Sequence, residues 1–257
     1  MGRDGVSTSM LDKAALVLGT FPGGSMMSLN DVCRQTGLAR STTHRLLVDL
    51  VDLGWVVRNG RHFELGMPLF ELGERVAVKH RLRSAAMPFM QDLFAVTKWT
   101  VHLAVRDGTE VVYVEKLQGH MPLPLPSHIG GRLPLSCTGV GKALLAFDDT
   151  GIRSTVLSRP LHRLTSRSIV DPGVLEKQLD DIRRTGVAIE REEATTGGCC
   201  AASAIVVSGA PVAALSVSVP VDKFKPELLA PAVRTAALAL SRVLSRVQSD
   251  PTAIPID

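Results

Sequence analysis

The stretch Gly37–Leu47, GLARSTTHRLL, changes character along its length. It carries two arginines, a histidine and three hydroxyl side chains before it closes on two leucines, and no acidic residue lies between Asp31 and Asp49. The second helix of a helix-turn-helix motif requires this order, because its N-terminal turns enter the major groove of DNA while its C-terminal turns pack on the first helix. The stretch therefore predicts a recognition helix that contacts duplex DNA.

The polar side chains of this helix are candidate DNA contacts. Arginine reaches phosphates or a guanine edge, and hydroxyl and imidazole groups donate to phosphate or base edges. Helical phase places Thr43 and Leu46 on the inward side instead. A solvated, capped helix face would carry arginines too, so the surrounding pattern has to decide between the two interpretations. The candidates are Arg40, Ser41, Thr42, His44 and Arg45.

Two helices are predicted before this stretch. Ser9 is expected to cap a first helix that runs to Pro22–Gly24, where the Pro-Gly-Gly sequence ends it. Ser28 is expected to cap a second, with Asp31 completing an acidic variant of the capping box. Gly37 then ends the second helix in the left-handed conformation. This is the helix–turn–helix arrangement that a recognition helix needs.

A hairpin is predicted after the recognition helix. That helix is expected over residues 40–53, with Leu53 on its buried side, and two β-like runs then flank Asn59-Gly60, a strong signal for a two-residue turn. Arg58 and Arg61 lie beside the hairpin tip, where they can reach the DNA backbone. Three helices and a hairpin predict a winged helix-turn-helix domain over residues 1–66.

The rest of the chain predicts a second folding unit of the α+β class. Pro68 begins a connecting helix, assigned to residues 67–82, and residues 83–257 form the second domain. Strands are expected over residues 100–106 and 110–117, joined by a turn at Asp107-Gly108 and followed by a Pro-rich loop. Further strands and helices predict an antiparallel sheet with packed helices. The helices are expected over residues 85–96, 140–147, 151–157, 174–185 and 226–247 and the later strands over 187–191, 201–207 and 212–219.

A ligand site is predicted at the start of one of these helices. Thr138 in SCTGVGKALL can act as the N-cap, and Gly139 and Val140 then present free backbone N–H groups. The helix dipole favours an anion at this position, so a carboxylate is the simplest guest. Ser216 and Ser218 are two residues apart in a predicted strand and share one of its faces. Each of these residues also has a structural interpretation, as a cap or a strand hydroxyl.

Three separated motifs resemble one family. The segment SLNDVCRQTGLARSTTHRLLVDLVDLGWVVR, followed by FELG, is similar to the DNA-binding domain of the IclR family of bacterial transcriptional regulators, and GGRLPLSCTGVGKALLA and ALSVSVP resemble two segments of its effector domain. The resemblance implies a winged helix-turn-helix, a linker helix and a GAF-like effector domain. It also implies dimers, often paired into tetramers, that bind palindromic operators in double-stranded DNA and respond to small organic or aromatic acids. The implied effector-binding residues are Gly139, Val140, Cys200, Ser216 and Ser218, to which the sequence adds Thr138 and Glu190.

Other chemistries find little support in the sequence. The GVGK segment fails the phosphate-loop pattern, because Ser136 and Ala143 stand where glycine and Ser or Thr are required. The seven histidines and four cysteines show no metal-ligand spacing, and His102 is interpreted as a structural or pocket residue. We therefore expect no enzyme activity, cofactor or metal, a cytoplasmic location and no membrane segment. One rival hypothesis stays open: a sensor or enzyme whose first domain docks protein. A steep salt dependence of binding to duplex DNA would distinguish the regulator from it.

Overall fold

The computed structural model describes residues 9–21, 25–120 and 125–249. These residues form two compact units, which divide between Ala77 and Val78. Each unit has its own apolar core, as two independently folding segments require.

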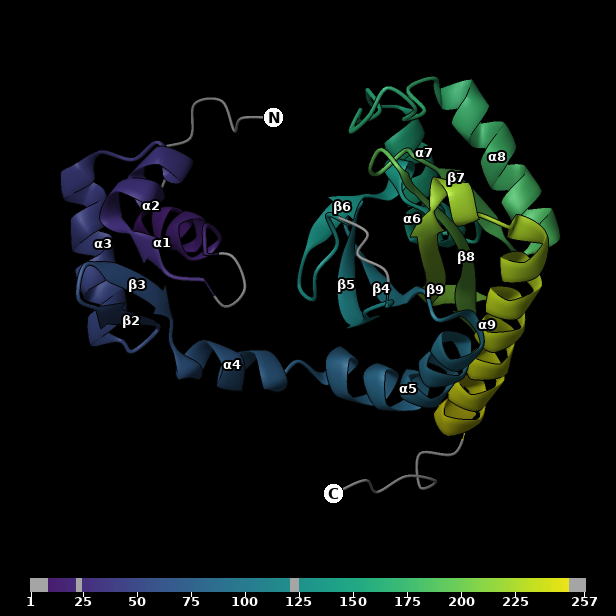
Figure 1. Ribbon diagram of the computed structural model, residues 1–257, viewed down its shortest axis with the longest axis horizontal. Coiled ribbons are helices and arrows are strands. Elements are labelled where there is room, and N and C mark those ends of the chain that lie inside the picture. The colour runs from purple at the N-terminus through teal and green to yellow at the C-terminus, as the bar shows by residue number, and fades with distance from the viewer. Residues whose placement is uncertain (1–8, 22–24, 121–124, 250–257) are drawn as a thin grey trace. The chain divides into compact units, whose positions relative to one another are not determined.

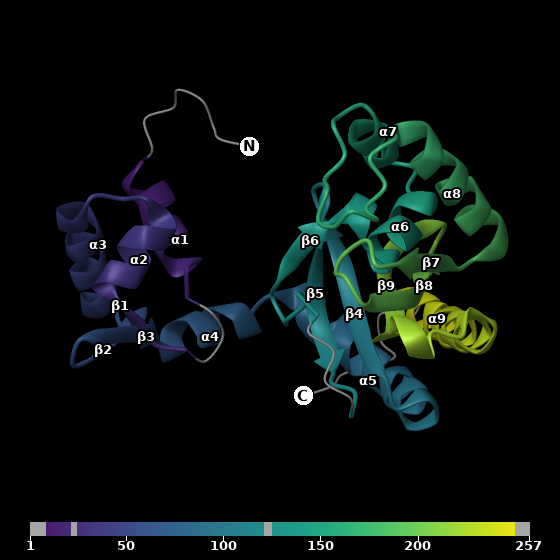
Figure 2. The same cartoon turned by 45° about the horizontal axis from the view of Figure 1, so that its top comes forward.

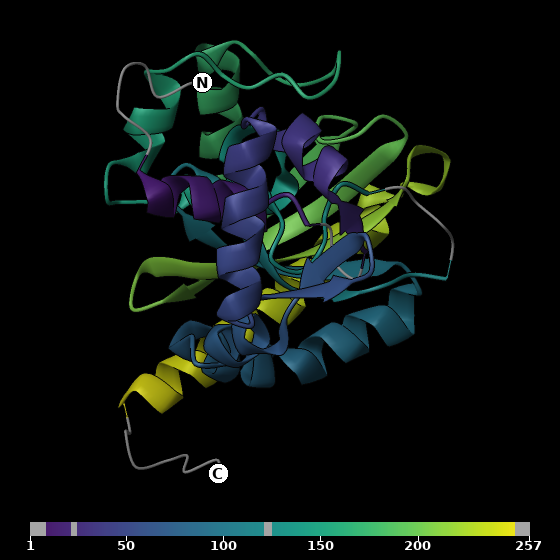
Figure 3. The same ribbon diagram turned by 90° about the vertical axis from the view of Figure 1, so that its left-hand side faces the viewer.

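The first unit is a three-helix cluster with a small antiparallel sheet (Figures 1 and 3). Val17, Val32 and Leu47 have no exposed surface, and each comes from a different helix, so the three helices share one core. The sheet has the strand order β1-β3-β2. The elements of this cluster and sheet are α1 (Met10–Leu18), α2 (Leu29–Thr36), α3 (Arg40–Asp52), β1 (Met27–Ser28), β2 (Val56–Asn59) and β3 (His62–Leu65), and α4 (Met67–Glu74) follows them in the same unit.

The predicted helix boundaries of this unit follow from local capping. Ser9 and Ser28 each form a capping box with the aspartate three residues later. Gly37 has φ of 68°, and its N–H donates to the carbonyl of Cys33. A left-handed residue at this position redirects the chain from α2 into α3. The predicted helix–turn–helix order is confirmed.

Three details of the prediction for this unit are wrong. The first helix already ends at Leu18, and the expected terminator Pro22–Gly24 lies outside the described residues. Leu53 is 60% exposed, because it is the C-cap that follows the last residue of α3 and does not continue the helix's buried face. The hairpin loop is Gly60–Arg61 rather than Asn59-Gly60, since Asn59 pairs with His62 across the strands. Glycine thus occupies the first loop position, with φ of 63°, as a II′-type turn requires.

The predicted connecting helix is two helices. α4 (Met67–Glu74) has Arg75 as its C-cap, and after Val76 a separate helix, α5 (Ala77–Thr97), continues to the strand region. Gly73 lies in the last turn of α4, where its low helix propensity favours termination. The single helix expected over residues 67–82 is therefore wrong, and residue 82 lies inside α5 rather than at a boundary.

The second unit is a six-stranded antiparallel sheet with helices on both faces (Figures 1 and 2). Helices α6, α7 and α8 share one apolar cluster with one face of the sheet, and α5 and α9 share another with the opposite face. The strand order is β6-β5-β4-β9-β8-β7. The elements are β4 (Thr100–Asp107), β5 (Glu110–Leu117), β6 (Arg132–Pro134), the 3-10 turn η1 (Leu135–Cys137), α6 (Gly139–Ala146), α7 (Ile152–Leu157), α8 (Pro172–Thr185), β7 (Ala188–Arg191), β8 (Gly198–Val207), β9 (Ala210–Pro220), the 3-10 turn η2 (Val221–Lys223) and α9 (Pro226–Ser249).

The predicted α+β class is confirmed, with two local corrections. Asp107 pairs with Glu110, so the β4–β5 loop is Gly108–Thr109 and not Asp107-Gly108. The Pro-rich segment contains a short strand, β6, which pairs with β5 and closes one edge of the sheet. Strand pairing over such a distance depends on tertiary contacts that local propensity does not encode.

The register of the sheet brings polar residues into rows on the α6 face. Glu190 lies opposite Cys200, Cys200 opposite Ser218, and Ser218 opposite Thr100. Ser216 lies opposite His102 in the next row. Directly paired residues point to the same side of a sheet, so four strands present these groups together.

Helix α9 contains one stretch, Pro226–Arg246, that is long and apolar enough to cross a membrane by length and composition. Its buried residues Leu229, Val233, Ala237 and Leu240 follow helical spacing and pack on the sheet. In this structure α9 therefore packs one apolar face on the sheet of the second unit.

Candidate functional site

The first two turns of α3 present the predicted polar side chains to the surface. Arg40, Ser41, His44 and Arg45 are exposed and Thr42 is half-buried, whereas Leu46 faces the core. The N-cap residue of α3 makes no side-chain cap hydrogen bond, and its first turn contains no acidic residue. Free N–H groups and the positive end of the dipole suit this end of the helix to a phosphate.

Arg40 is engaged within the unit, but it keeps donors available. One of its guanidinium nitrogens donates to Oδ1 of Asn30 on α2. Since guanidinium has five N–H donors, this bond fixes the side chain without exhausting it.

The hairpin arginines lie at the β2–β3 tip. Arg58 is exposed, its Nε donates to the carbonyl of Gly60 at 3.0 Å, and its Cζ lies 5.9 Å from the centroid of the Phe63 ring. Arg61 is exposed in the loop itself. Both guanidinium groups are therefore at the surface, with Arg58 the more restrained of the two.

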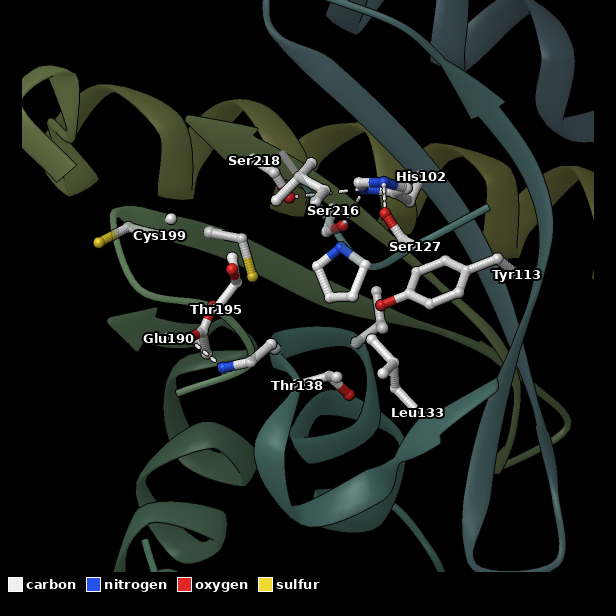
Figure 4. Close-up of a pocket in the computed structure, with 17 residues that line it drawn as sticks. His102, Tyr113, Ser127, Leu133, Thr138, Glu190, Thr195, Cys199, Ser216 and Ser218 are labelled. Carbon is white, nitrogen blue, oxygen red and sulfur yellow. Dashed lines mark hydrogen bonds between the residues drawn. The ribbon is translucent and has the colours of Figure 1, made fainter. Parts of the chain in front are cut away.

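In the second unit, all seven residues predicted for effector binding line one cavity (Figure 4). The space between its walls is about 390 Å³, open solvent at its mouth included. The walls come from strands β4 to β9, the first turn of α6 with its N-cap, the segment before β6 and the β7–β8 loop. The lining residues are the predicted Thr138, Gly139, Val140, Glu190, Cys200, Ser216 and Ser218, with His102, Tyr113, Leu125, Pro126, Ser127, Leu133, Ala194, Thr195, Gly198 and Cys199.

Helix α6 begins directly against the sheet at this cavity. Thr138 is its N-cap, as expected, and Oγ1 accepts from the N–H of Gly141 at 3.1 Å. A Cβ at Gly139 would lie 2.5 Å from Sγ of Cys200 and 3.5 Å from Cβ of Glu190. Only glycine permits this approach, which brings the N–H groups of the first turn beside Glu190 and Cys200.

His102 is held at the opposite wall by serine hydroxyls. Its Nε2 lies 2.8 Å from Oγ of Ser127, and its Nδ1 lies 3.4 Å from Oγ of both Ser216 and Ser218. Burial, together with the nearby charge of Lys116, lowers the pKa of His102 to about 3. The imidazole is therefore neutral at neutral pH and cannot serve as a cation for a bound anion.

Tyr113 stands beside His102, with ring centroids 5.1 Å apart. It is the chain's single tyrosine. Burial raises the pKa of its phenol, so the hydroxyl keeps its proton and remains a donor. In Figure 4 this hydroxyl points into the cavity.

Glu190 brings a carboxyl group into the same cavity. Its Oε1 accepts from the backbone N–H of Glu193 and from that of Ala194 at 3.3 Å. Burial nevertheless raises the pKa of Glu190 to about 7. Burial raises the pKa of the neighbouring Cys200 thiol well above its ordinary value, and the negative charge of Glu190 raises it further. The thiol is therefore a protonated wall group and not a nucleophile.

No lysine or arginine belongs to the residues that line this cavity in the described part of the chain. Lys142 of α6 is fully buried outside it, where Nζ donates to Oε1 of Glu193 at 2.5 Å and to Oε1 of Gln178 at 3.1 Å. The pair joins α6 to the β7–β8 loop, which supplies Ala194 and Thr195 to the cavity wall. It therefore positions two walls without contacting the cavity.

The two units correspond to two known domains. Residues 10–60 match the family described as IclR helix-turn-helix domain, and residues 74–242 match the family described as bacterial transcriptional regulator IclR C-terminal. The chain belongs to the IclR family of bacterial transcriptional regulators. It has the family's helix-turn-helix and C-terminal effector-binding domains.

Named relatives and solved structures agree with this membership. The HTH-type transcriptional repressor AllR of Klebsiella pneumoniae is 32% identical over 208 residues, which cover 79% of this chain and 76% of the relative. The AllR of Escherichia coli K12 is 33% identical over 201 residues, which cover 77% of this chain and 74% of the relative. An IclR homologue from Microbacterium hydrocarbonoxydans, solved with 4-hydroxybenzoate, has a TM-score of 0.82 at 30% identity, covering 93% of this chain and all of that one. The Thermotoga maritima IclR structure has a TM-score of 0.73 at 29% identity and covers 91% of this chain and 98% of that one.

Several wall residues of this IclR-family cavity were not predicted from sequence. Tyr113 and Leu133 come from β5 and β6, and Pro126 and Ser127 come from the segment expected to be a loop. The alternation of buried residues along β5 could have placed Tyr113 on a covered face, but not on the cavity. The prolines of that segment did not indicate that it would form part of the cavity wall.

Proposed function

We propose that this chain binds a palindromic operator in duplex DNA through α3 and the β2–β3 hairpin, and that a small organic acid in the second unit's cavity modulates this binding. The proposal names the residues of this chain that would perform the family's regulatory function and the class of ligand that would control it. Its main support is the cavity at the N-terminus of α6, where every residue expected to contact an effector lines one wall or another.

The DNA part of the proposal is supported by the surface of α3. Arg40, Ser41, His44 and Arg45 are exposed on its first two turns, with Arg58 and Arg61 at the hairpin tip. Arginine and hydroxyl groups on a recognition helix read base edges, and arginines on a wing neutralise phosphates. Both AllR relatives are named repressors, which favours repression as the outcome, and a DNA-binding regulator acts in the cytoplasm.

The effector part is supported by the chemistry of the cavity. Backbone N–H groups at the start of α6 and the hydroxyls of Tyr113, Ser216 and Ser218 are donors, and a carboxylate is an acceptor. The Microbacterium homologue was solved with 4-hydroxybenzoate, which is an aromatic carboxylate. We therefore assign carboxylic acids as the effector class.

Replacing both Ser216 and Ser218 with leucine tests the effector part. The two side chains share the cavity face of β9, so leucines there fill the space a ligand needs and remove two donors. We expect the effector to lose its influence on DNA binding while DNA binding without effector persists. Calorimetric titration with a panel of carboxylates and gel-shift assays with and without them measure both properties.

The matched control is Val217→Leu together with Val219→Leu, which places the same side chains on the opposite face of β9. A control that also lost the response, at unchanged folding, would attribute the effect to β9 as a whole. A normal response in the serine variant would reject the cavity as the effector site.

We also propose that the chain acts as a homodimer, with further pairing into tetramers. The first unit exposes apolar side chains on α1, where Leu11 is 82% exposed, and on α4, where Met67 is 67% exposed. Exposed apolar side chains of this kind are typical of surfaces that bind a second chain. Light scattering should give a mass of at least two chains at micromolar concentration, and Leu11→Glu with Met67→Glu should lower it. A stable monomer in the unmodified protein would contradict the proposal.

A further inference from the structure

We propose that Glu190 holds a carboxylate effector as a neutral carboxylic acid, so that effector binding takes up one proton. This inference rests on the proposed carboxylate site and specifies how that site accepts a negative charge. It predicts that the regulator senses the acidity of its surroundings together with the concentration of its effector.

The geometry places Glu190 beside the position where a carboxylate would bind. Its Cβ lies 3.5 Å from the point that a Cβ on Gly139 would occupy, so the side chain stands against the first turn of α6. That turn carries the N–H groups that favour an anion. A ligand carboxylate there lies next to the Glu190 carboxyl group.

The cavity offers no cation that would let both carboxylates remain ionised. No lysine or arginine lines it within the described residues, and His102 is neutral. The charge of Lys142 on α6 lowers the pKa of Glu190 less than burial raises it, and Nζ of Lys142 is engaged by Glu193 and Gln178. The other titratable groups around Glu190 are acids: Glu193 in the β7–β8 loop, Cys199 and Cys200 on β8 and Tyr113 on β5.

Two adjacent carboxyl groups in one site share a single proton, because the second ionisation would place like charges side by side. Glu190 is the carboxyl group that would keep that proton. Burial already raises its pKa to about 7, so the negative charge of a bound carboxylate suffices to keep it protonated at neutral pH. Its Oε1 accepts two backbone N–H bonds, so Oε2 is the oxygen that would carry the proton.

The sign of the pH dependence follows from this arrangement. An anion raises the pKa of Glu190 above its value of about 7 in the free protein, so the complex binds more protons than the separate partners. Affinity is therefore constant well below pH 7 and falls as pH rises through 7, by up to about tenfold between pH 6 and pH 8. If the ionised Glu190 instead accepted a hydrogen bond from the ligand, affinity would rise over the same range.

Isothermal titration calorimetry of the full chain tests the inference. The probes are acetate, benzoate and 4-hydroxybenzoate, titrated at pH 6, 7 and 8 in pairs of buffers that differ in ionisation enthalpy. The difference between buffers gives the protons taken up, and we expect about 0.9 proton at pH 8 for a carboxylate that binds. Carboxyl and phenol groups on these probes keep their charge state over this range, since their ordinary pKa values are about 4 and 10.

One uncharged ligand and two variants provide the controls. 4-Hydroxybenzamide has the shape of 4-hydroxybenzoate without its charge, so it should bind with no proton uptake. Glu190→Gln keeps a donor in place of the acid, so it should bind 4-hydroxybenzoate with no proton uptake and equal affinity at all three pH values. Glu227→Gln, an exposed acid on α9, should behave as the unmodified protein does.

Each result of the calorimetric titrations either supports or overturns the proposed protonation of Glu190. Carboxylate binding without proton uptake, or with affinity that rises with pH, overturns the role of Glu190 and leaves the proposed carboxylate site intact. If none of the carboxylates binds, the proposed site and this inference both fall. The measurements on the unmodified protein decide the question even where Glu190→Gln fails to fold.

Discussion

Replacing Arg45 with alanine is expected to weaken operator binding by about 1–3 kcal/mol, which is roughly a five- to 150-fold loss of affinity. Arg45 is exposed on the second turn of α3, on the helix face that the packing of Thr43 and Leu46 leaves toward solvent. A bidentate contact with guanine supplies this magnitude, and its loss leaves a polar base edge unpaired. Fluorescence anisotropy with an operator obtained by binding-site selection measures the change.

The salt dependence of the same titration separates two roles of Arg45. If it contacts a base, discrimination against altered operators relaxes at one position; if it contacts a phosphate, all sequences weaken alike and the salt slope decreases by about 1. Arg184→Ala removes one exposed charge from α8 in the second unit and should change neither quantity. Unchanged affinity in the Arg45 variant would remove this residue from the interface. A flat salt dependence in the unmodified protein would favour a protein-docking role for the first unit.

Replacing Lys142 with methionine is expected to lower the free energy of unfolding of the second unit by about 3–5 kcal/mol. The ammonium has no exposed surface and pairs with Glu193, whose side chain is 6% exposed. Removing one member of a buried pair leaves the other charge buried without compensation, which costs about this much. Oε2 of Glu193 already has no hydrogen-bond partner within the described structure, so the pair is under-satisfied before any change. Urea denaturation followed by circular dichroism gives the free energy.

The double variant Lys142→Met with Glu193→Met distinguishes an ion-pair effect from a packing effect. Apolar replacement of both members often restores stability, so we expect the double variant to be more stable than either single variant. The matched control is the exposed pair of Arg184 and Asp181 on α8, for which alanine substitutions should cost about 0–1 kcal/mol. Equal losses in the single and double variants would show that the cost comes from shape alone.

The first unit could be predicted almost completely from sequence because its boundaries are set by local chemistry. Ser28 and Asp31 form the capping box that their spacing predicts, and Gly37 takes the left-handed conformation that its place predicts. The errors in the predicted boundaries arise where contacts with neighbouring residues set the boundary. Gly60 occupies the first rather than the second loop position because Asn59 pairs with His62. The break after α4 reflects a weak helix former, Gly73, within a pattern of otherwise continuous helical spacing.

The cavity was predictable only in part, for a different reason. Ser216 and Ser218 could be placed together by strand periodicity, and Thr138 with Gly139 by helix capping, and the cavity contains them all. His102 and Tyr113 enter it because β4 lies beside β9 in the sheet and β5 lies beside β4, an order that follows from pairing between distant segments. The state of Glu190 depends on burial, which no local pattern encodes. The roles of all these residues in effector binding remain predictions for the experiments above.

The alternation along β8 and β9 has a consequence for engineering. Cavity positions such as Cys200, Ser216 and Ser218 alternate with Ala201, Leu215 and Val217, which pack beneath α5 and α9. A combinatorial library restricted to the former group would diversify the chemicals a biosensor detects without disturbing the layer that keeps the unit folded. A single inserted residue within β9 would do the reverse, since it would exchange the two sets and turn valines toward the ligand.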